Sequence, residues 1–139
     1  CGIDEEVAFA ETFLHSTAVD TRIVALSEIG RRGRAQIESS RPLRLVDLTG
    51  AGLSSIGADA RLCSGDYAVA QRWSLALFRH PDLPDGLYYR SRIDPSRFSA
   101  AIFERAQPLL TYTALGSLVD TGNVHILARV LNTYHVGLV

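Results

Sequence analysis

Glu11 is a carboxylate whose setting in this sequence points to chemistry. It lies in the segment DEEVAFAETFLHS, in which apolar residues repeat at helical spacing. On that helix we expect Val7, Phe9 and Phe13 to wrap the carboxylate partly. An acid shielded from water in this way stabilises a developing cation more strongly than a solvated acid does. Cleavage of a glycosidic bond creates such a cation on the sugar, so Glu11 is a candidate catalytic residue.

Ser91 is the second candidate. It follows Leu87–Tyr89, which reads as a short strand, and it stands between Arg90 and Arg92. A hydroxyl flanked by guanidinium groups at a strand end can bind the ribose or the phosphates of a nucleotide. The same residues also allow a purely structural interpretation, in which Glu11 is a solvated helix residue and Ser91 begins a turn.

Common catalytic and ligand-binding motifs are absent from the sequence. There is no GxGxxG, GxxxxGK[ST] or HExxH pattern, and the glycine-rich segment TGAGLSSIG lacks the lysine of a phosphate-binding loop. The four histidines, at positions 15, 80, 125 and 135, do not have the spacing of metal ligands, and two cysteines are too few for a cysteine zinc site. We therefore predict no metal cofactor. Ser91 lacks the Gly-x-Ser-x-Gly setting of a strained nucleophile, although a serine–histidine–acid triad remains an alternative.

Composition limits the class of protein. The 139 residues carry a formal net charge of −1, and all 14 basic residues are arginine. This balance gives no reason to expect direct binding to nucleic acid, and no apolar run approaches the roughly 20 residues of a membrane span. One domain with two cysteines fits a reduced cytoplasm. Because the sequence contains no methionine and begins at Cys1, we expect residues 1–139 to form a single domain that lacks its N-terminal part.

The elements that must position these residues are a mixture of helices and strands. Helices are predicted over residues 4–16, 66–80 and 123–136, the last with an apolar stripe of Val124, Leu127, Leu131 and Tyr134. Strands are predicted within residues 35–38, 43–48, 87–90, 98–106 and 109–120, whereas residues 21–29 fit a strand or a helix. Strands and helices do not alternate regularly, so we predict an α+β fold with a mixed sheet and flanking helices.

The order of these segments resembles the RES domain family, which is named after its Arg, Glu and Ser positions. The resemblance runs through GIDEEVAFAETFLH, with Glu11 at the family's Glu, and through PLRLVDLTG. In DYAVAQRWSLAL, Tyr67 and Gln71 match a Tyr…Gln pattern; DGLYYRSR then places Ser91 at the family's Ser, and AAIF follows. No single motif is highly specific, but five in the same order cover nearly the whole chain.

The resemblance implies a fold similar to that of ADP-ribosyltransferase toxins and a role as the toxin of a bacterial toxin–antitoxin pair. Family members consume NAD+, by hydrolysis or phosphorolysis, and their usual partner is an antitoxin with a helix-turn-helix domain of Xre type. By resemblance, Glu11 orients the nicotinamide ribose and stabilises its cation, and Ser91 hydrogen-bonds the nicotinamide side or the adjacent ribose. His15 matches a position that some members place near the ligand, and Arg92 is assigned to the phosphates from its position and charge.

Two alternatives remain open at the level of sequence. Either the enzyme transfers ADP-ribose to a cellular target, or the chain is a catalytically inactive module that binds its antitoxin. A departure from the family leaves room for the second alternative. The family's Arg, and a Tyr that accompanies it, lie N-terminal to the Glu helix, and no residue of this chain is assigned to either position.

Overall fold

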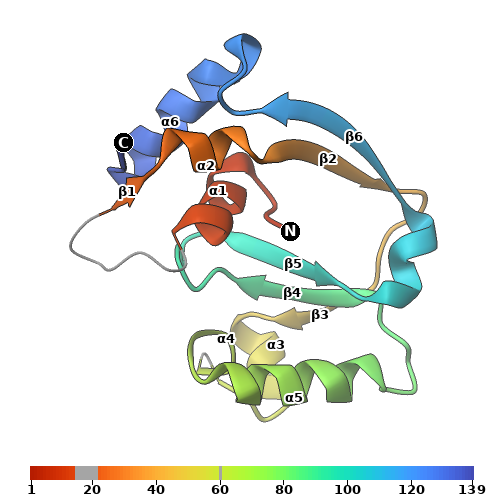
Figure 1. Cartoon of the computed structure of the whole chain (residues 1–139). Coiled ribbons are helices and arrows are strands. Elements are labelled where there is room, and N and C mark those ends of the chain that lie inside the picture. Colours follow the sequence, from red (N-terminus) through yellow and green to blue (C-terminus); the bar gives the residue numbers. More distant parts are fainter. Residues whose placement is uncertain (15–21, 60) are drawn as a thin grey trace.

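The computed structural model describes residues 1–14, 22–59 and 61–139, which form short helices and strands of both pairing types (Figure 1). In chain order these elements are α1 (Glu5–Phe13), β1 (Ile23–Val24), α2 (Leu26–Gly30), β2 (Gly33–Ser39), β3 (Leu45–Leu48), α3 (Gly50–Ser55), α4 (Arg61–Ser64), α5 (Tyr67–Phe78), β4 (Gly86–Arg90), β5 (Phe98–Ile102), the 3-10 helix η1 (Glu104–Leu109), β6 (Leu110–Ser117), the 3-10 helix η2 (Thr121–Asn123), α6 (Val124–Tyr134) and β7 (Gly137–Leu138).

Three strands form the central sheet, in the order β3-β4-β5. β3 runs parallel to β4, whereas β4 and β5 are antiparallel, with Leu87 opposite Ala101. The start of the chain extends this sheet, because Gly2 forms an antiparallel bridge to Ser99 of β5. The strands predicted within residues 43–48, 87–90 and 98–106 are confirmed, and the mixed pairing with separate helices makes the fold α+β.

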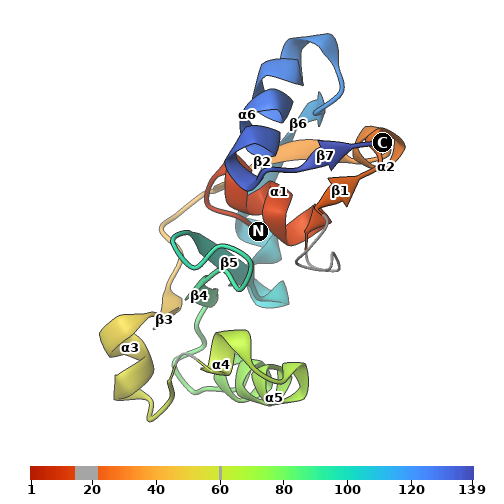
Figure 2. The same ribbon diagram turned by 90° about the vertical axis from the view of Figure 1, so that its left-hand side faces the viewer.

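Helices α3, α4 and α5 cover one face of this sheet and close a hydrophobic core with it (Figure 2). The buried residues of this core are Leu48, Leu53, Leu62 and Leu87, and Trp73 of α5 packs against them. The helix α5 is confirmed as predicted, and it begins at Asp66, whose carboxylate accepts a hydrogen bond from the Ala68 amide at 2.8 Å. All members of the core come from one continuous stretch of chain, residues 46–103.

A second core joins the two ends of the chain. Its buried residues come from the helices α1, α2 and α6 and from the short strands β1 and β7 beside them: Phe9, Ala10, Leu14, Val24, Ile29, Leu127, Val130, Tyr134 and Val136. β1 and β7 pair in parallel, with Ile23 opposite Gly137. In both views α6, β1 and β7 lie on the far side of α1 from α5 (Figures 1 and 2).

The last helix is confirmed, but its buried face differs from the predicted stripe. Leu127 and Tyr134 are buried as predicted, whereas Val124 is 49% exposed and the remaining buried positions are Ile126 and Val130. Both sets of residues have helical spacing, so periodicity alone does not choose between them. Packing against the second core decides which set faces inward.

β2 and β6 form a separate antiparallel ribbon that arches away from the central sheet (Figure 1). Its register runs from Ala35 opposite Ala114 to Ser39 opposite Leu110. Most of its residues are exposed on both faces. Its ends are anchored by polar contacts, including a 3.1 Å hydrogen bond from the Ser117 hydroxyl to the Ile29 carbonyl.

The remaining predicted elements agree with the structure at their centres. Within residues 22–29, which fit a strand or a helix, the chain forms both, β1 followed by α2. The first predicted helix corresponds to α1, which begins at Asp4, whose carboxylate accepts a hydrogen bond from the Val7 amide at 2.9 Å. In the described part of the chain, no helix combines the length and the apolar character that crossing a membrane requires.

Candidate functional site

Glu11 lies in the last turn of α1, and its surroundings are unusual for a carboxylate. The neighbouring helix residues Val7 and Ala10 are fully buried. The Oε1 atom of Glu11 is also buried, and no described residue donates a hydrogen bond to it. Buried polar atoms in folded proteins nearly always have hydrogen-bond partners, so this oxygen marks Glu11 as a functional candidate.

The aromatic residues expected to wrap Glu11 lie elsewhere. Phe9 and Phe13 contact each other, with ring centroids 4.9 Å apart, and both line a cavity that Glu11 does not line. Residues two positions apart on a helix point about 200° from each other, which places these rings on another face of α1. The aromatic residue on which the Glu11 charge acts is instead Tyr89 of β4, whose pKa it raises.

Tyr89 and Ser99 form a polar pair on the central sheet. They lie directly opposite each other on the antiparallel strands β4 and β5, so their side chains share a face. Burial raises the pKa of Tyr89 and is the largest cause of this shift. The charges of Glu11 and Cys63 raise the same pKa further. Ser99 is 1% exposed and its hydroxyl lowers the pKa of Tyr89, although no described atom meets hydrogen-bond geometry at the Ser99 Oγ. The phenol therefore stays protonated at neutral pH, close to Glu11.

Ser91 has a structural role that its position in the sequence did not settle. It is 2% exposed, and its Oγ accepts hydrogen bonds from the amides of Ile93 and Asp94, both at 3.1 Å. Its own amide donates to the Arg97 carbonyl at 3.0 Å. Ser91 thus opens the turn between β4 and β5, as the structural interpretation expected, and its buried hydroxyl serves there as the acceptor.

A charged network fixes this turn against α1 and α6. Arg97 forms ion pairs with Asp94 at 3.2 Å and with Asp4 at 2.7 Å, so it joins the turn to the N-terminus of α1. The Tyr134 hydroxyl of α6 donates to Asp94 Oδ2 at 2.9 Å. These contacts hold the end of β4, and with it Ser91, in one position relative to the helix that carries Glu11.

The positions of the two predicted catalytic residues, Glu11 and Ser91, can both be described relative to Tyr89. The charge of Glu11 acts on the pKa of Tyr89, which pairs with Ser99 across the strands, and Ser91 follows Tyr89 by two residues along the chain. Among the described residues, no hydrogen bond joins Ser91 to Glu11. Arg92 is exposed, and within the described chain no ion pair or hydrogen bond engages its guanidinium. His15 lies outside the described residues.

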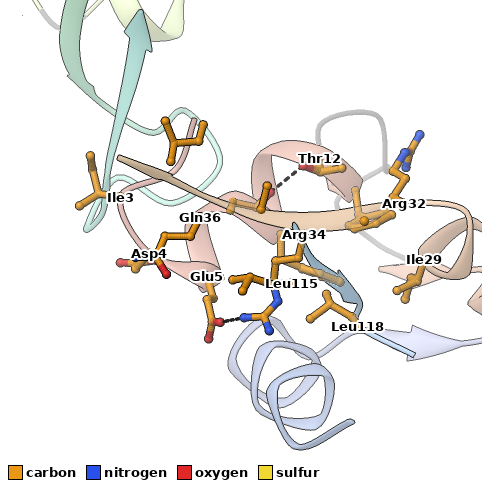
Figure 3. A pocket seen from close by; sticks show the side chains of 16 residues that line it. Ile3, Asp4, Glu5, Thr12, Ile29, Arg32, Arg34, Gln36, Leu115 and Leu118 are labelled. Carbon is orange, nitrogen blue, oxygen red and sulfur yellow. Dashed lines mark hydrogen bonds and ion pairs between the residues drawn. The ribbon is translucent and has the colours of Figure 1, made fainter. Parts of the chain in front are cut away.

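A cavity lies on another face of α1 (Figure 3). It has a volume of about 610 Å³ and is bounded by α1, by β2 and by the start of the chain. Phe9 and Phe13 form part of its apolar lining, and Arg32 and Gln36 are among its polar residues. Neither Glu11 nor Ser91 lines it.

Tyr89 and Ser99 were missed at the level of sequence, although a signal for them exists. Both belong to predicted strands on either side of a short turn, and Tyr89 precedes the candidate Ser91 by two residues. An assumed hairpin register would have paired them. Within the described chain, no cluster of three or more His, Cys, Asp or Glu side chains has the arrangement of a metal site.

The arrangement can stabilise positive charge next to hydrogen-bond donors. Glu11 supplies an acid with one buried oxygen that lacks a partner, Tyr89 supplies a neutral phenol, and Ser99 supplies a buried hydroxyl. A carboxylate of this kind complements a cationic or strongly polarised group, although Glu11, Tyr89 and Ser99 line neither of the two cavities described. Cys63 is a poor nucleophile here because burial raises the pKa of its thiol.

Comparisons with known proteins agree with the sequence pattern. The family model of the RES domain matches residues 1–120. A protein of Sinorhizobium fredii named "Probable toxin y4kH" is 32% identical over 99 residues, which are 70% of this chain and 76% of that protein. No solved structure matches the chain.

Proposed function

This chain belongs to the RES domain family, and from that premise we propose that it is a toxin of a toxin–antitoxin pair that consumes NAD+ by cleaving the nicotinamide–ribose bond. The toxin role is supported by the relative in Sinorhizobium fredii, whose name describes a probable toxin. The choice of NAD+ comes from the family resemblance of the segments around Glu11 and Ser91.

The observation that carries the chemical proposal is the buried, unpartnered Oε1 of Glu11. When the bond between nicotinamide and C1′ breaks, the bonding electrons leave with the pyridinium nitrogen and the ribose becomes an oxocarbenium-like cation. A carboxylate in a partly buried place attracts this cation more strongly than one in bulk water. Water or phosphate then adds to C1′, and a water molecule that adds releases one proton.

The neighbouring residues have supporting roles in this proposal. The pKa of Tyr89 is raised, so its phenol remains a neutral donor that can hydrogen-bond a ribose hydroxyl or Glu11 itself. Ser91 donates its free hydroxyl hydrogen to the carboxamide or to the ribose. Arg92, exposed and without a partner in the described chain, contacts the phosphates, and the family resemblance assigns His15 to a place near the ligand.

The partner in the proposed pair is an antitoxin with a helix-turn-helix domain of Xre type, in keeping with the family resemblance. We place the toxin in the cytoplasm, where NAD+ is available. No metal takes part in the proposed reaction. Transfer of ADP-ribose to a cellular acceptor uses the same bond cleavage and the same Glu11, so the two reactions differ only in the nucleophile.

Loss of NAD+ measured with purified protein tests the role of Glu11. We expect Glu11→Gln to reduce turnover at least about 100-fold, because the amide removes the charge but retains the shape. Glu104→Gln is the matched control, since Glu104 is exposed on η1, and it should leave turnover unchanged. Analysis of the products by mass spectrometry distinguishes free ADP-ribose, ADP-ribose 1″-phosphate and a modified acceptor.

Thermal unfolding of the same variants separates chemistry from folding. Glu11→Gln should melt at the same temperature as the wild type or higher. The reason is that it neutralises a carboxylate whose buried Oε1 accepts no hydrogen bond from a described residue. The proposal is wrong if Glu11→Gln turns over NAD+ at the wild-type rate. It is also wrong if the folded wild-type protein, with and without phosphate or cell lysate as a source of acceptors, consumes no NAD+.

A further inference from the structure

The cavity on α1 borders the backbone edge of β2. Five consecutive residues of this strand, 33–37, line the cavity. Successive side chains of a strand point to opposite faces, so a run of five lining residues indicates that the edge of β2 borders the cavity, which also reaches Leu115 of β6 at one end of the ribbon. Among the described residues, β6 is the only strand that pairs with β2, and it lies on the other edge.

The register shows which backbone groups point toward the cavity. The Ser40 amide donates to the Leu109 carbonyl at 2.9 Å, and the pairing of β2 with β6 continues from there without a shift as far as Ala35. In an antiparallel pair, alternate residues direct their amide and carbonyl groups to the partner strand. Gln36 and Glu38 therefore face β6, and the backbone groups of Ala35 and Ile37 face the open edge.

A second strand edge lies across the cavity. Ile3 and Asp4 line its opposite wall, next to Gly2, which is bridged to β5 (Figure 3). Ile3 is 59% exposed. The cavity thus separates the outer edge of the central sheet from the free edge of the ribbon. A space of about 610 Å³ between two strand edges suits an extended peptide.

The lining of the cavity defines the chemistry of such a peptide. Phe13, which is half-buried, offers an apolar surface to alternate side chains, whereas Phe9 beside it is 3% exposed. Arg32 lies over the Phe13 ring at 5.0 Å, and its nearest acid, Glu28, is 4.0 Å away and is shared with Arg31. The side chain of Arg32 is 48% exposed, so its charge is open to an acidic residue.

We propose that this cavity receives an extended segment of a partner protein, which adds to β2 as a third strand of the ribbon. Alternate apolar side chains of the segment pack on Phe13, and an acidic side chain pairs with Arg32. The proposal is independent of NAD+ consumption, because Glu11 does not line the cavity. A two-stranded ribbon exposed on both faces gains stability from a third strand.

Hydrogen exchange of single amides, measured by NMR on the whole chain, tests this proposal. The probe is a synthetic hexapeptide of alternating glutamate and valine with blocked ends. In the free protein at low concentration, the amides of Gln36 and Glu38 should exchange slowly and those of Ala35 and Ile37 rapidly. Saturating peptide should slow Ala35 and Ile37 at least about tenfold, whereas a peptide N-methylated at alternate residues should have no effect.

A pair of variants tests whether the peptide binds through this edge. Ile37→Pro removes the amide hydrogen that points to the open edge and leaves the hydrogen bonds to β6 in place. It should therefore weaken peptide binding at least about tenfold. Ile37→Ala keeps that amide and should bind with nearly the wild-type affinity. The proposal is overturned if millimolar peptide leaves the exchange of Ala35 and Ile37 unchanged. It is equally overturned if both amides are already protected in the free protein, because the edge is then covered by the chain itself or by a second copy.

Discussion

The central sheet and the β2–β6 ribbon are both built from short strands, but they differ in what covers them. In the sheet, Leu87 and Ala100 are 6% and 3% exposed, because helices or neighbouring chain segments pack against them. In the ribbon, Ile37 and Tyr112 are 49% and 78% exposed. The sheet is therefore held by packing, whereas the ribbon is held by its own ladder of hydrogen bonds and by anchors at its ends.

This difference indicates two kinds of site in one small domain. The unpartnered oxygens of Glu11 and Ser99 lie at the packed sheet, where a fixed geometry and shielding from water strengthen electrostatic effects. The unpartnered backbone groups of Ala35 and Ile37 lie on the open ribbon, where a peptide can be added without disturbing a core. We therefore expect chemistry at the sheet and recognition at the ribbon.

The largest expected change in stability comes from substituting a glycine of the central sheet, and a glycine of the ribbon provides the comparison. A Cβ on Gly86, in β4, would lie 2.4 Å from the Ala101 carbonyl oxygen, so Gly86→Ala should lower the free energy of unfolding by about 3 kcal/mol. A Cβ on Gly33, in β2, would meet nothing within 4 Å, so Gly33→Ala should change it by less than about 0.5 kcal/mol. Urea denaturation of both variants measures the difference. Equal losses would contradict the distinction between a packed sheet and an open ribbon.

Asp85, which precedes β4 of the sheet, is hydrogen-bonded to Arg41, which follows β2 of the ribbon. Its substitution is expected to cause the next largest change in stability. It is 3% exposed and accepts hydrogen bonds from Arg41 at 2.8 and 2.9 Å and from the Arg44 amide at 2.8 Å. The Arg41 guanidinium, followed by the Arg44 amide, lowers the pKa of Asp85 to about 2. Because the folded pKa is below the unfolded one, this stabilisation is present above about pH 4 and is lost as the pH falls toward 2.

Asp85→Asn should therefore reduce the free energy of unfolding by about 2 kcal/mol at pH 7, and by clearly less near pH 2.5. Denaturant titrations at the two pH values measure this change. Asp82→Asn is a suitable control, because the Asp82 side chain is 84% exposed. A loss that is the same at both pH values would show that shape, and not charge, determines the role of Asp85.

Ser91→Ala should have a smaller effect on stability. The change leaves the amides of Ile93 and Asp94 without their acceptor, at a cost of about 1 kcal/mol. Ser91→Thr keeps the acceptor oxygen and provides the comparison. If Ser91 also binds ligand, NAD+ turnover by Ser91→Ala should fall by more than its loss of folded protein explains, as circular dichroism and turnover measured at one temperature would show. Unchanged turnover in the folded fraction would leave Ser91 a turn residue only.

The smallest effect is expected on the ribbon's surface. Tyr112 is 78% exposed, and threonine also favours strands, so Tyr112→Thr should change the free energy of unfolding by less than about 0.5 kcal/mol. Thermal denaturation is sufficient to measure it. A loss above about 1 kcal/mol would mean that the ribbon is packed against something in solution, which would remove the contrast with the sheet.

Much of the fold could be predicted from local signals. Asp4 and Asp66 both cap helices where the sequence indicates, and the strands β2 to β6 correspond to predicted ones. The shortest elements could not be found in this way. β7 has two residues, and its partner β1 lies near the other end of the chain, so its existence depends on tertiary pairing and not on local preference.

The candidate site was less accessible to sequence reasoning. The helix that carries Glu11 was predictable, but the neighbours of its carboxylate were not, because they depend on how α1 meets β4 and β5. Tyr89 and Ser99 are paired by the strand register, which the sequence does not state. The hydrogen bonds of Ser91 to the turn likewise appear only once the turn's backbone is known.

The two hydrophobic cores imply an order of events when the chain folds. The core beneath the central sheet uses one continuous stretch, residues 46–103, whereas the other core needs both ends of the polypeptide. Closing a long loop is entropically costly and slow, so contacts between distant segments form late. We expect the part with β4 and α5 to gain structure first during refolding, and the helix bearing Glu11 to reach its final place only when α6 docks.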